Sequence, residues 1–457
     1  MRRIYILLAV SAFIQSVYLF TLPISFESDA GGYLSYAKLF ANMGGWFQYW
    51  RPPGYPLYIH LLGVTWAQSF TGVIVANALM GIAMPLLVYG ILHPAGKRTA
   101  FIAALILALS TVPFSYTKVM ITEHPYSFFL LLGAFGFSRF VATKAVLWAA
   151  LTCIALLTAM MMRNEAGYIL GLAVLMMFAQ CRDWRKAGSV AACALVAVAV
   201  IMGWSWKRAE IMREPTAFGS LHNFTGRQMF WRVYYSVGNG SLVNVRSENG
   251  PASRQLAEMF PGLLDHPSHE NNWKIGQSVV ERYGVIKGDD FLKQVVRETI
   301  AAHPEILIEF ARSAVEYLGV NLAGPVIIWH YDVYEAMPFN IGQAAQRTMT
   351  PGLMQQYTTS YQRQSKTLAT IHRAGQQAHN MLRISVGALL VLSIGFLPFT
   401  RHRWLAIFLF LTSGMLIGAA VLGFGFNVRY EHMILSFLLM TASLALVTVI
   451  ESRDEKP

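Results

Sequence analysis

The sequence has 457 residues, of which 55% are hydrophobic and 13% are charged, and its mean hydropathy is +0.44. Soluble domains carry roughly 25% charged residues, so this composition excludes a soluble globular protein and indicates a polytopic membrane protein. The formal net charge is +12, but the basic residues stand mostly in short segments between apolar runs. That distribution is typical of topology signals and argues against a nucleic-acid partner.

The chain begins with a basic and then apolar segment, MRRIYILLAVSAFIQSVYLFTLPIS, which resembles a signal peptide. Its apolar run is longer than the roughly 7–15 residues of a cleaved signal. We therefore predict an uncleaved first membrane helix with its N-terminus in the cytoplasm. Three cysteines lie in or beside later apolar runs and predict no disulfide framework: Cys153, Cys181 and Cys193.

Apolar runs of about 20 residues can cross a bilayer as helices. We predict an all-α polytopic membrane protein with about ten such helices. In chain order they are Ile4–Ile24, Gly72–Leu92, Thr99–Ser115, Pro125–Val141, Ala145–Met162, Ala166–Gln180, Ala187–Trp206, Met381–Phe399, Trp404–Phe426 and His432–Ile450.

Basic segments separate these runs in such a way that a single topology places all of the segments on the cytoplasmic side. With the N-terminus inside, the segments HPAGKR, CRDWRKAG and TRHR, the linker after the fourth run and the C-terminal tail all face the cytoplasm. Basic residues are enriched in cytoplasmic loops. This pattern predicts a protein of the bacterial inner membrane with both termini cytoplasmic.

Three regions follow from this topology. Residues 1–206 form a transmembrane core with an external loop at 25–71, residues 207–380 form an external, mainly helical soluble cap, and residues 381–457 form C-terminal membrane helices with a short cytoplasmic tail. An apolar stretch at 304–331 carries recurrent charges, which are unfavourable in a membrane span. We expect that stretch to be an amphipathic helix.

The first loop contains two polar motifs close to the bilayer. In SDAGGY, Asp29 either caps a short helix or is a reactive carboxylate, with glycines that let a ligand approach the backbone. In WRPPGYPLY, Arg51 either extends from a rigid turn to lipid headgroups or holds a phosphate.

Two later motifs place charges on the same external face. In ITEHPY, Glu123 and His124 open a membrane helix, where Thr122 or Glu123 could simply cap that helix. In MMRNEAGY, Arg163 and Glu165 form either a surface ion pair in an ordinary turn or part of a shared pocket.

Taken in order, these motifs resemble the GT-C superfamily of membrane glycosyltransferases, above all its protein O-mannosyltransferases and lipid A aminoarabinose transferases, as in glycosyltransferase family 39. SDAGGY matches their acid and tyrosine after the first helix, and RPPGYPLY their basic residue before proline. ITEHPY matches their second acid, and MMRNEAGY their basic residue after the fifth helix. The resemblance covers residues 1–206. Aminoarabinose transferases usually carry another acid directly after the first aspartate, where this chain has Ala30.

The resemblance implies transfer of a hexosyl or pentosyl sugar from a polyprenyl-phosphate donor, held among membrane lipids, to an acceptor lipid, glycan or protein on the external face. Asp29 is then the general base, Glu123 the second acid, and Arg51 and Arg163 bind the donor phosphate. Candidate substrate-binding residues are Tyr33, Tyr55, His124, Glu165 and Arg429. A divalent cation is a candidate cofactor with no assigned ligands.

Three other functions fit a polytopic protein with intramembrane charges. A structural or assembly protein predicts no effect of charge-conserving changes at Asp29. A transporter or flippase of lipid-linked sugars would show two related halves and broken helices near the midplane. An O-antigen ligase-type enzyme would carry its key residues in the late external loop. Here the charged motifs cluster at the external face of the first six predicted helices, and the sequence has no internal repeat, so we favour the glycosyltransferase.

The predicted topology can be tested with an impermeant thiol reagent. Single cysteines placed near Gly240 and Gly352 should both react in intact cells or spheroplasts, because residues 207–380 are expected to face outward as one block. Protection of the Gly352 site alone would mean that the stretch at 304–331 crosses the membrane.

Overall fold

The computed structural model describes residues 2–21, 23–26, 30–42, 52–110, 112–211, 225–235, 245–264, 268–312, 349–362, 400, 402–423 and 431–454. Asp29, Arg51 and Arg429, together with the predicted span Met381–Phe399, lie outside these residues. The chain divides into two compact units. The first comprises residues 1–198, 320–416 and 428–457, and the second comprises 199–319 and 417–427.

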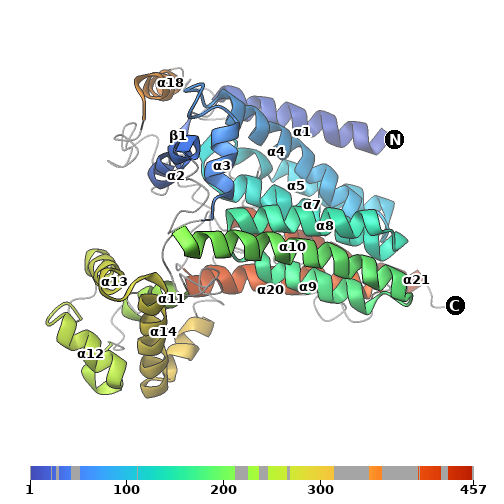
Figure 1. The fold of residues 1–457 in the computed structure, drawn as a ribbon. Helices are drawn as coiled ribbons and strands as arrows, with labels where there is room; N and C mark the ends of the chain where they lie inside the picture. Colours follow the sequence, from blue (N-terminus) through green and yellow to red (C-terminus); the bar gives the residue numbers. More distant parts are fainter. Residues whose placement is uncertain are drawn as a thin grey trace. The chain divides into compact units, whose positions relative to one another are not determined.

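The first unit is a bundle of long apolar helices (Figure 1). It contains α1 (Arg2–Thr21), α4 (Thr71–Leu92), α5 (Lys97–Leu109), α6 (Val112–Ser115), α7 (Glu123–Thr143), α8 (Val146–Met162), α9 (Ala166–Ala179) and α21 (Glu431–Asp454), together with parts of α10 (Trp184–Ile211) and α20 (Arg403–Gly423). Eight of the ten predicted spans each correspond to one of these helices, and a ninth is divided between two of them.

The predicted span Thr99–Ser115 differs from expectation, because it is divided between α5 and α6. Pro113 gives the physical reason. A proline interrupts the hydrogen bonds of a helix interior but is tolerated in the first turn of a new helix. α5 accordingly ends at Leu109, and Pro113 lies at the start of α6.

Length and composition identify this chain as an integral membrane protein. Within the described residues, four helices are long and apolar enough to cross a membrane, namely Arg2–Phe20, α4, α7 and Trp184–Lys207. α8 and α9 are apolar but shorter. Large hydrophobic side chains are exposed along these helices, including Leu147, Ile154 and Leu175. Such side chains are stable when they contact lipid.

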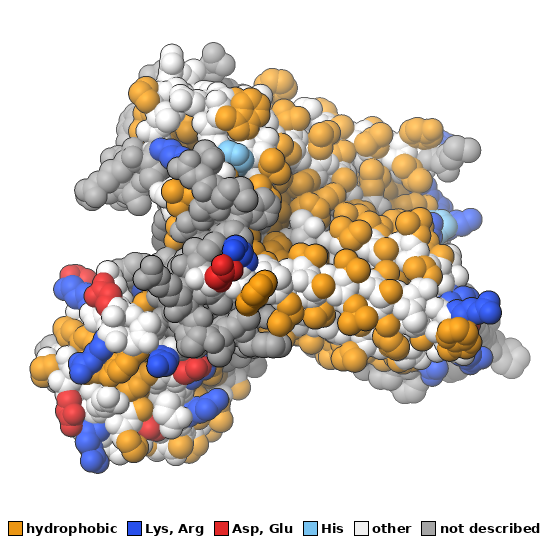
Figure 2. All heavy atoms as spheres, viewed as in Figure 1, with side chains coloured by type: hydrophobic (Ala, Val, Ile, Leu, Met, Phe, Trp, Pro, Cys, Tyr) orange, Lys and Arg blue, Asp and Glu red, His pale blue; other side chains and the backbone are white. Residues whose placement is uncertain are grey.

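The bundle surface carries its charges at the end of the helices. Figure 2 shows hydrophobic side chains spread over the face of the bundle and basic side chains at the end where α1 begins. α21, the last described helix of the chain, also ends on this side in Figure 1. The topology predicted from the sequence, with both termini in the cytoplasm, requires basic side chains to gather at one end of the bundle.

Glycines bring α7 and α8 into close contact. A Cβ atom at Gly136 would lie 2.7 Å from Thr152 Oγ1, and one at Gly133 would lie 2.6 Å from Leu156 Cδ2. Small residues at such positions let membrane helices pack backbone to backbone. Because the two helices are joined by a short link at Lys144, the start of α7 and the end of α8 lie at the same end of the bundle.

Short elements gather at that end (Figure 1). They are α2 (Ala30–Lys38), η1 (Leu39–Asn42), α3 (Gly54–Leu61), α18 (Pro351–Gln362) and two short strands. β1 (Ser25–Phe26) and β2 (Val119–Met120) pair in parallel, with Ser25 opposite Val119 and Phe26 opposite Met120. The short helix expected after Asp29 is confirmed as α2.

The second unit is a small helical domain with its own core. It contains α11 (Thr225–Tyr235), η4 (Ser247–Asn249), α12 (Pro251–Met259), α13 (His269–Tyr283) and α14 (Val285–Ala302), with acidic and basic side chains on its surface (Figure 2). The Glu298 carboxylate accepts hydrogen bonds from the backbone nitrogens of Ala252 and Ser253, at 3.1 and 2.8 Å. It thereby satisfies donors at the start of α12 that have no partner within the helix.

The expectation that 207–380 forms one external cap stays a prediction. Of its described residues, those up to 312 belong to the second unit, whereas α18 belongs to the first unit. The reason is hydrophobic packing, since Leu353 and Tyr357 of α18 are buried in the same core as residues of α2 and α3. Residues 305–312 are helical, and the remainder of the amphipathic helix expected at 304–331 lies outside the described residues.

Candidate functional site

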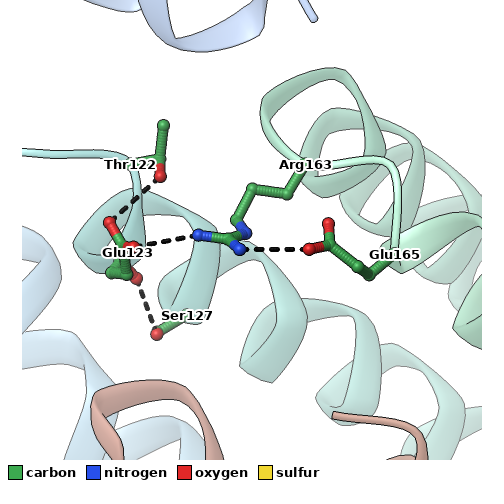
Figure 3. A network of polar contacts seen from close by, with 5 residues as sticks. All are labelled: Thr122, Glu123, Ser127, Arg163 and Glu165. Atoms are coloured by element: carbon green, nitrogen blue, oxygen red, sulfur yellow. Dashed lines mark hydrogen bonds and ion pairs between the residues drawn. The ribbon is translucent and has the colours of Figure 1, made fainter. Parts of the chain in front are cut away.

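The candidate site is built on a buried ion pair between two helix ends. Arg163 follows α8, and its Nη1 lies 2.9 Å from Oε1 of Glu123, the first residue of α7. Nη2 of Arg163 lies 3.0 Å from Oε1 of Glu165. Figure 3 shows the guanidinium between the two carboxylates. The structure therefore brings together three of the site residues expected from sequence.

Glu123 is not a surface residue. Its side chain is 0% exposed, and its second oxygen, Oε2, accepts a hydrogen bond of 3.0 Å from Thr122 Oγ1. A carboxylate removed from water needs such partners, and the positive end of the helix dipole at the start of α7 stabilises it further. The Thr122 side chain makes no capping hydrogen bond to α7. The interpretation of Thr122 as a simple cap is therefore wrong.

Arg163 is also largely enclosed, with only 12% of its side chain exposed. Its guanidinium carbon lies 5.7 Å from the ring centroid of Tyr126, one turn after Glu123 on α7, in a cation–π contact. An ordinary surface ion pair between Arg163 and Glu165 therefore does not describe this arrangement, because Arg163 is largely buried and also pairs with Glu123. Pairs between exposed side chains contribute little, whereas a largely buried arginine with two carboxylates is held firmly.

Glu165 keeps its charge in this arrangement. Burial by itself would raise the pKa of the Glu165 carboxyl, but the charge of Arg163 and the hydrogen bonds made to the carboxylate outweigh burial and lower the pKa. Two carboxylates therefore face one guanidinium, one bonded to Nη1 and the other to Nη2.

Aromatic side chains of the first loop lie beside this site. Tyr33 on α2 and Tyr55 on α3 are buried, with ring centroids 4.8 Å apart in an edge-to-face contact. The Tyr58 ring stacks on Tyr55 at 5.9 Å. Tyr357 of α18 contacts Phe26 at 5.4 Å and closes the same cluster from a distant part of the chain.

A polar network fixes the start of α7 from behind. Nε2 of His124 lies 2.8 Å from the backbone carbonyl oxygen of Asn77 on α4. The Asn77 side chain bonds the Thr117 carbonyl at 3.1 Å and the Tyr58 hydroxyl at 2.7 Å. Thr117 in turn bonds Gln15 of α1 at 3.1 Å. Because one nitrogen of His124 is used structurally, its role in substrate binding stays a prediction.

Gly54 positions the first loop against the ion pair. A Cβ atom at this position would lie 2.5 Å from the carbonyl oxygen of Met161 and 2.9 Å from the backbone nitrogen of Met162. The start of α3 thus rests on the last turn of α8, directly before Arg163. Only glycine permits this approach without displacing backbone.

The described residues contain no group of three or more His, Cys, Asp or Glu side chains that could hold a metal ion. The two acidic side chains of the candidate site, Glu123 and Glu165, both bond Arg163. The candidate divalent cation therefore has no assigned ligands in this part of the chain and stays a prediction, as do the roles of Asp29, Arg51 and Arg429.

Two residues of the first unit with notable surroundings were not identified as candidates from the sequence. Lys118 precedes β2, and burial lowers the pKa of its amine to about 8. Gln356 of α18 accepts from the backbone nitrogen of Phe70 and donates to the carbonyl of Gln68, both at 3.1 Å. Lys118 could have been noticed because it stands close to the ITEHPY motif in the sequence. No local pattern indicated Gln356.

Residues 51–206 match the family model described as dolichyl-phosphate-mannose-protein mannosyltransferase. This match confirms the resemblance to GT-C membrane glycosyltransferases over the segment that contains Glu123, Arg163 and Glu165. A search of curated protein sequences gives no match.

Among solved structures, the chain is similar to ArnT from Cupriavidus metallidurans bound to undecaprenyl phosphate, with 13% identity, 97% of this chain and 77% of that chain covered, and a TM-score of 0.38. It is also similar to the Archaeoglobus fulgidus oligosaccharyltransferase in the apo form, with 12% identity, 98% and 51% coverage, and a TM-score of 0.42. The chain thus spans about half of the latter protein. These low values support no correspondence between individual residues.

The contact at Gly54 predicts a contrast between two glycines. Gly54→Ala should destabilise the protein by about 1–3 kcal/mol, as overpacking does, because Met161 can only yield by moving backbone. Gly171→Ala in α9 is the matched control, since a Cβ there meets nothing within 4 Å. It should be neutral or stabilising by about 0.5–1 kcal/mol. Thermal unfolding in detergent measures both, and equal stability of the two variants would contradict the packing argument.

Proposed function

We propose that this protein is a glycosyltransferase that moves a sugar from a polyprenyl-phosphate donor to a lipid, glycan or protein acceptor at the external face of a membrane. The observation that carries the proposal is the buried Glu123–Arg163 pair, because it lies where two apolar helices end, within the segment that matches the mannosyltransferase family. Its position supports chemistry on a lipid-linked substrate, whose phosphate cannot leave the membrane surface.

The strand pair precedes both proposed acids in the sequence. β1 and β2 are parallel, and Phe26 lies opposite Met120. Asp29 and Glu123 each follow three residues after these paired positions in the sequence, and Asp29 itself lies outside the described residues. From the order of the motifs, we propose Asp29 as the base and Glu123 as the second acid.

The proposed reaction is a single displacement. An acceptor hydroxyl or amine gives its proton to Asp29, and its oxygen or nitrogen forms a bond to the anomeric carbon of the sugar. The bond between that carbon and the phosphate oxygen breaks, and the electron pair leaves with the polyprenyl phosphate. General-base assistance is worth roughly 10²–10⁴ in rate. Arg51 and Arg163 stabilise the negative charge that develops on the phosphate.

The arrangement around Arg163 also indicates which carboxylate a donor phosphate would displace more easily. Glu123 is fully buried, whereas the Glu165 side chain is 30% exposed. If Glu165 moves into water, no buried charge loses its partner. If Glu123 moves away from Arg163, a buried carboxylate is left unpaired. We therefore propose that the donor phosphate replaces Glu165 on Arg163 while Glu123 keeps its bond. Glu165 thus belongs to the binding site as a group that yields to substrate.

The role of Arg163 is best tested with lysine. Arg163→Ala would leave the Glu123 carboxylate buried without its partner, which destabilises a protein by about 3–5 kcal/mol and confounds any kinetic result. Arg163→Lys keeps the charge but loses the planar pair of N–H groups that suits a phosphate. We expect a folded protein with a KM for the donor raised roughly tenfold, from about 1.4 kcal/mol of lost binding.

Arg139→Lys, near the end of α7, is the matched control for this experiment. Arg139 makes cation–π contacts with Phe135 and Trp148 and is far along the helix from Glu123. Its substitution should leave donor kinetics unchanged. Equal kinetics of Arg163→Lys and the wild-type protein would remove the argument for phosphate binding at Arg163.

The role of Asp29 is tested by substitution with asparagine. Asp29→Asn keeps the size and any capping hydrogen bond but cannot accept a proton, so we expect normal insertion and loss of most transferase activity. Glu123→Gln should also impair transfer. The assay follows sugar transfer in membranes from a panel of radiolabelled polyprenyl-phosphate sugars, which also identifies the sugar.

Asp183→Asn controls for capping alone, because Asp183 Oδ1 accepts a hydrogen bond from the Arg185 backbone nitrogen at 2.9 Å and thus caps the start of α10. Asparagine and aspartate are equally good caps, so this variant should be fully active. If Asp29→Asn is as active as Asp183→Asn, Asp29 is not the base.

A further inference from the structure

The buried hydroxyl of Tyr55 is a polar group that the packing leaves unsatisfied. The Tyr55 side chain is 0% exposed, and its hydroxyl has no hydrogen-bond partner among the described residues. Tyr58, three residues later on the same helix, differs in this respect, because its hydroxyl bonds Asn77 Oδ1 at 2.7 Å. Burial of an unpaired hydroxyl is unfavourable, so its presence calls for an explanation.

Tyr55 lies beside the ion pair. Gly54, directly before it, contacts the Met161 carbonyl at the end of α8, and Arg163 follows two residues later. The Tyr33 and Tyr58 rings hold the Tyr55 ring on two sides. This packing restrains the ring, so the hydroxyl is preorganised without being satisfied.

The electrostatic surroundings decide which kind of partner suits this hydroxyl. Burial raises the pKa of Tyr55 well above its usual value, and Tyr58, Tyr33 and the Glu123 carboxylate raise it further. The phenol therefore keeps its proton and acts as a hydrogen-bond donor. The strongest acceptors for a neutral donor are charged oxygens. Next to an arginine, an anionic ligand can supply such oxygens.

We propose that the Tyr55 hydroxyl donates a hydrogen bond to a phosphate oxygen of the lipid-linked substrate that Arg163 binds. This inference rests on the proposed function and adds a neutral donor to its phosphate site. Arg163 supplies the charge from the end of α8, and Tyr55 supplies a fixed direction from the start of α3. The ligand chemistry is a lipid-linked phosphate, which is a diester in the sugar donor and a monoester in the polyprenyl phosphate that the reaction releases, and its source is the membrane.

The test compares Tyr55→Phe with Tyr58→Phe in the purified full-length protein in detergent. Tyr55→Phe removes a hydroxyl without a partner, so its unfolding temperature should equal or exceed that of the wild-type protein. Its dissociation constant for polyprenyl phosphate should rise about tenfold, because a hydrogen bond to a charged group is lost. Tyr58→Phe should show the opposite pattern, with lower stability and unchanged affinity.

Two further ligands identify what is bound. Polyprenol, which lacks the phosphate, should bind the wild-type protein and Tyr55→Phe equally, and a matching loss of affinity for polyprenol would overturn the phosphate assignment. Binding of inorganic phosphate as tightly as polyprenyl phosphate would assign the site to free phosphate and overturn the lipid-linked source.

The outcomes separate this inference from the proposed function. If polyprenyl phosphate does not bind the wild-type protein, the proposed function fails. If it binds the wild-type protein and Tyr55→Phe equally but Arg163→Lys more weakly, only the assignment of Tyr55 fails. Failure of Tyr55→Phe to fold, or a loss of stability as large as that of Tyr58→Phe, would show that the hydroxyl is structural and would also overturn the inference.

Discussion

A fully buried carboxylate, Glu123, imposes the constraint on which the candidate site depends. A charge removed from water at the end of an apolar helix must be paired, and Arg163 provides the partner at 2.9 Å. That pairing requires the start of α7 and the end of α8 to lie side by side, which the glycine contacts along the two helices permit. The position of the first loop follows, because Gly54 rests on the last turn of α8.

Arg163 has two roles in this proposal, and removing its side chain would abolish both at once. It neutralises Glu123 within the protein, and in the proposed reaction it also binds the donor phosphate. Glu165 balances these roles, since it occupies a second nitrogen of the guanidinium at 3.0 Å and is more exposed than Glu123. In the proposed reaction, the Arg163 guanidinium stays paired in the absence of substrate and becomes available to the donor phosphate when that phosphate replaces Glu165.

Much of the helical architecture was predictable because apolar run length is a local property. Eight predicted spans each correspond to one helix, and the break at Pro113, which divides a ninth, follows from proline geometry. The motifs that contain Glu123, Arg163 and Glu165 were also recognisable, because charges beside apolar runs are conspicuous. The packing of α18 was not, since Gln356 bonds the backbone of Gln68 and Phe70, which lie far away in the sequence.

The sequence by itself determined the membrane class, the positions of most helices and the charged residues at their ends, because hydropathy and charge are read residue by residue along the chain. Only the tertiary structure decided that Arg163 lies between Glu123 and Glu165 and that β1 pairs with β2 in parallel. It also decided that the Tyr55 hydroxyl is buried without a partner among the described residues, whereas Tyr58 has one. These features depend on which side chains meet across helices. Such contacts are set by close packing between distant segments, which no local pattern encodes.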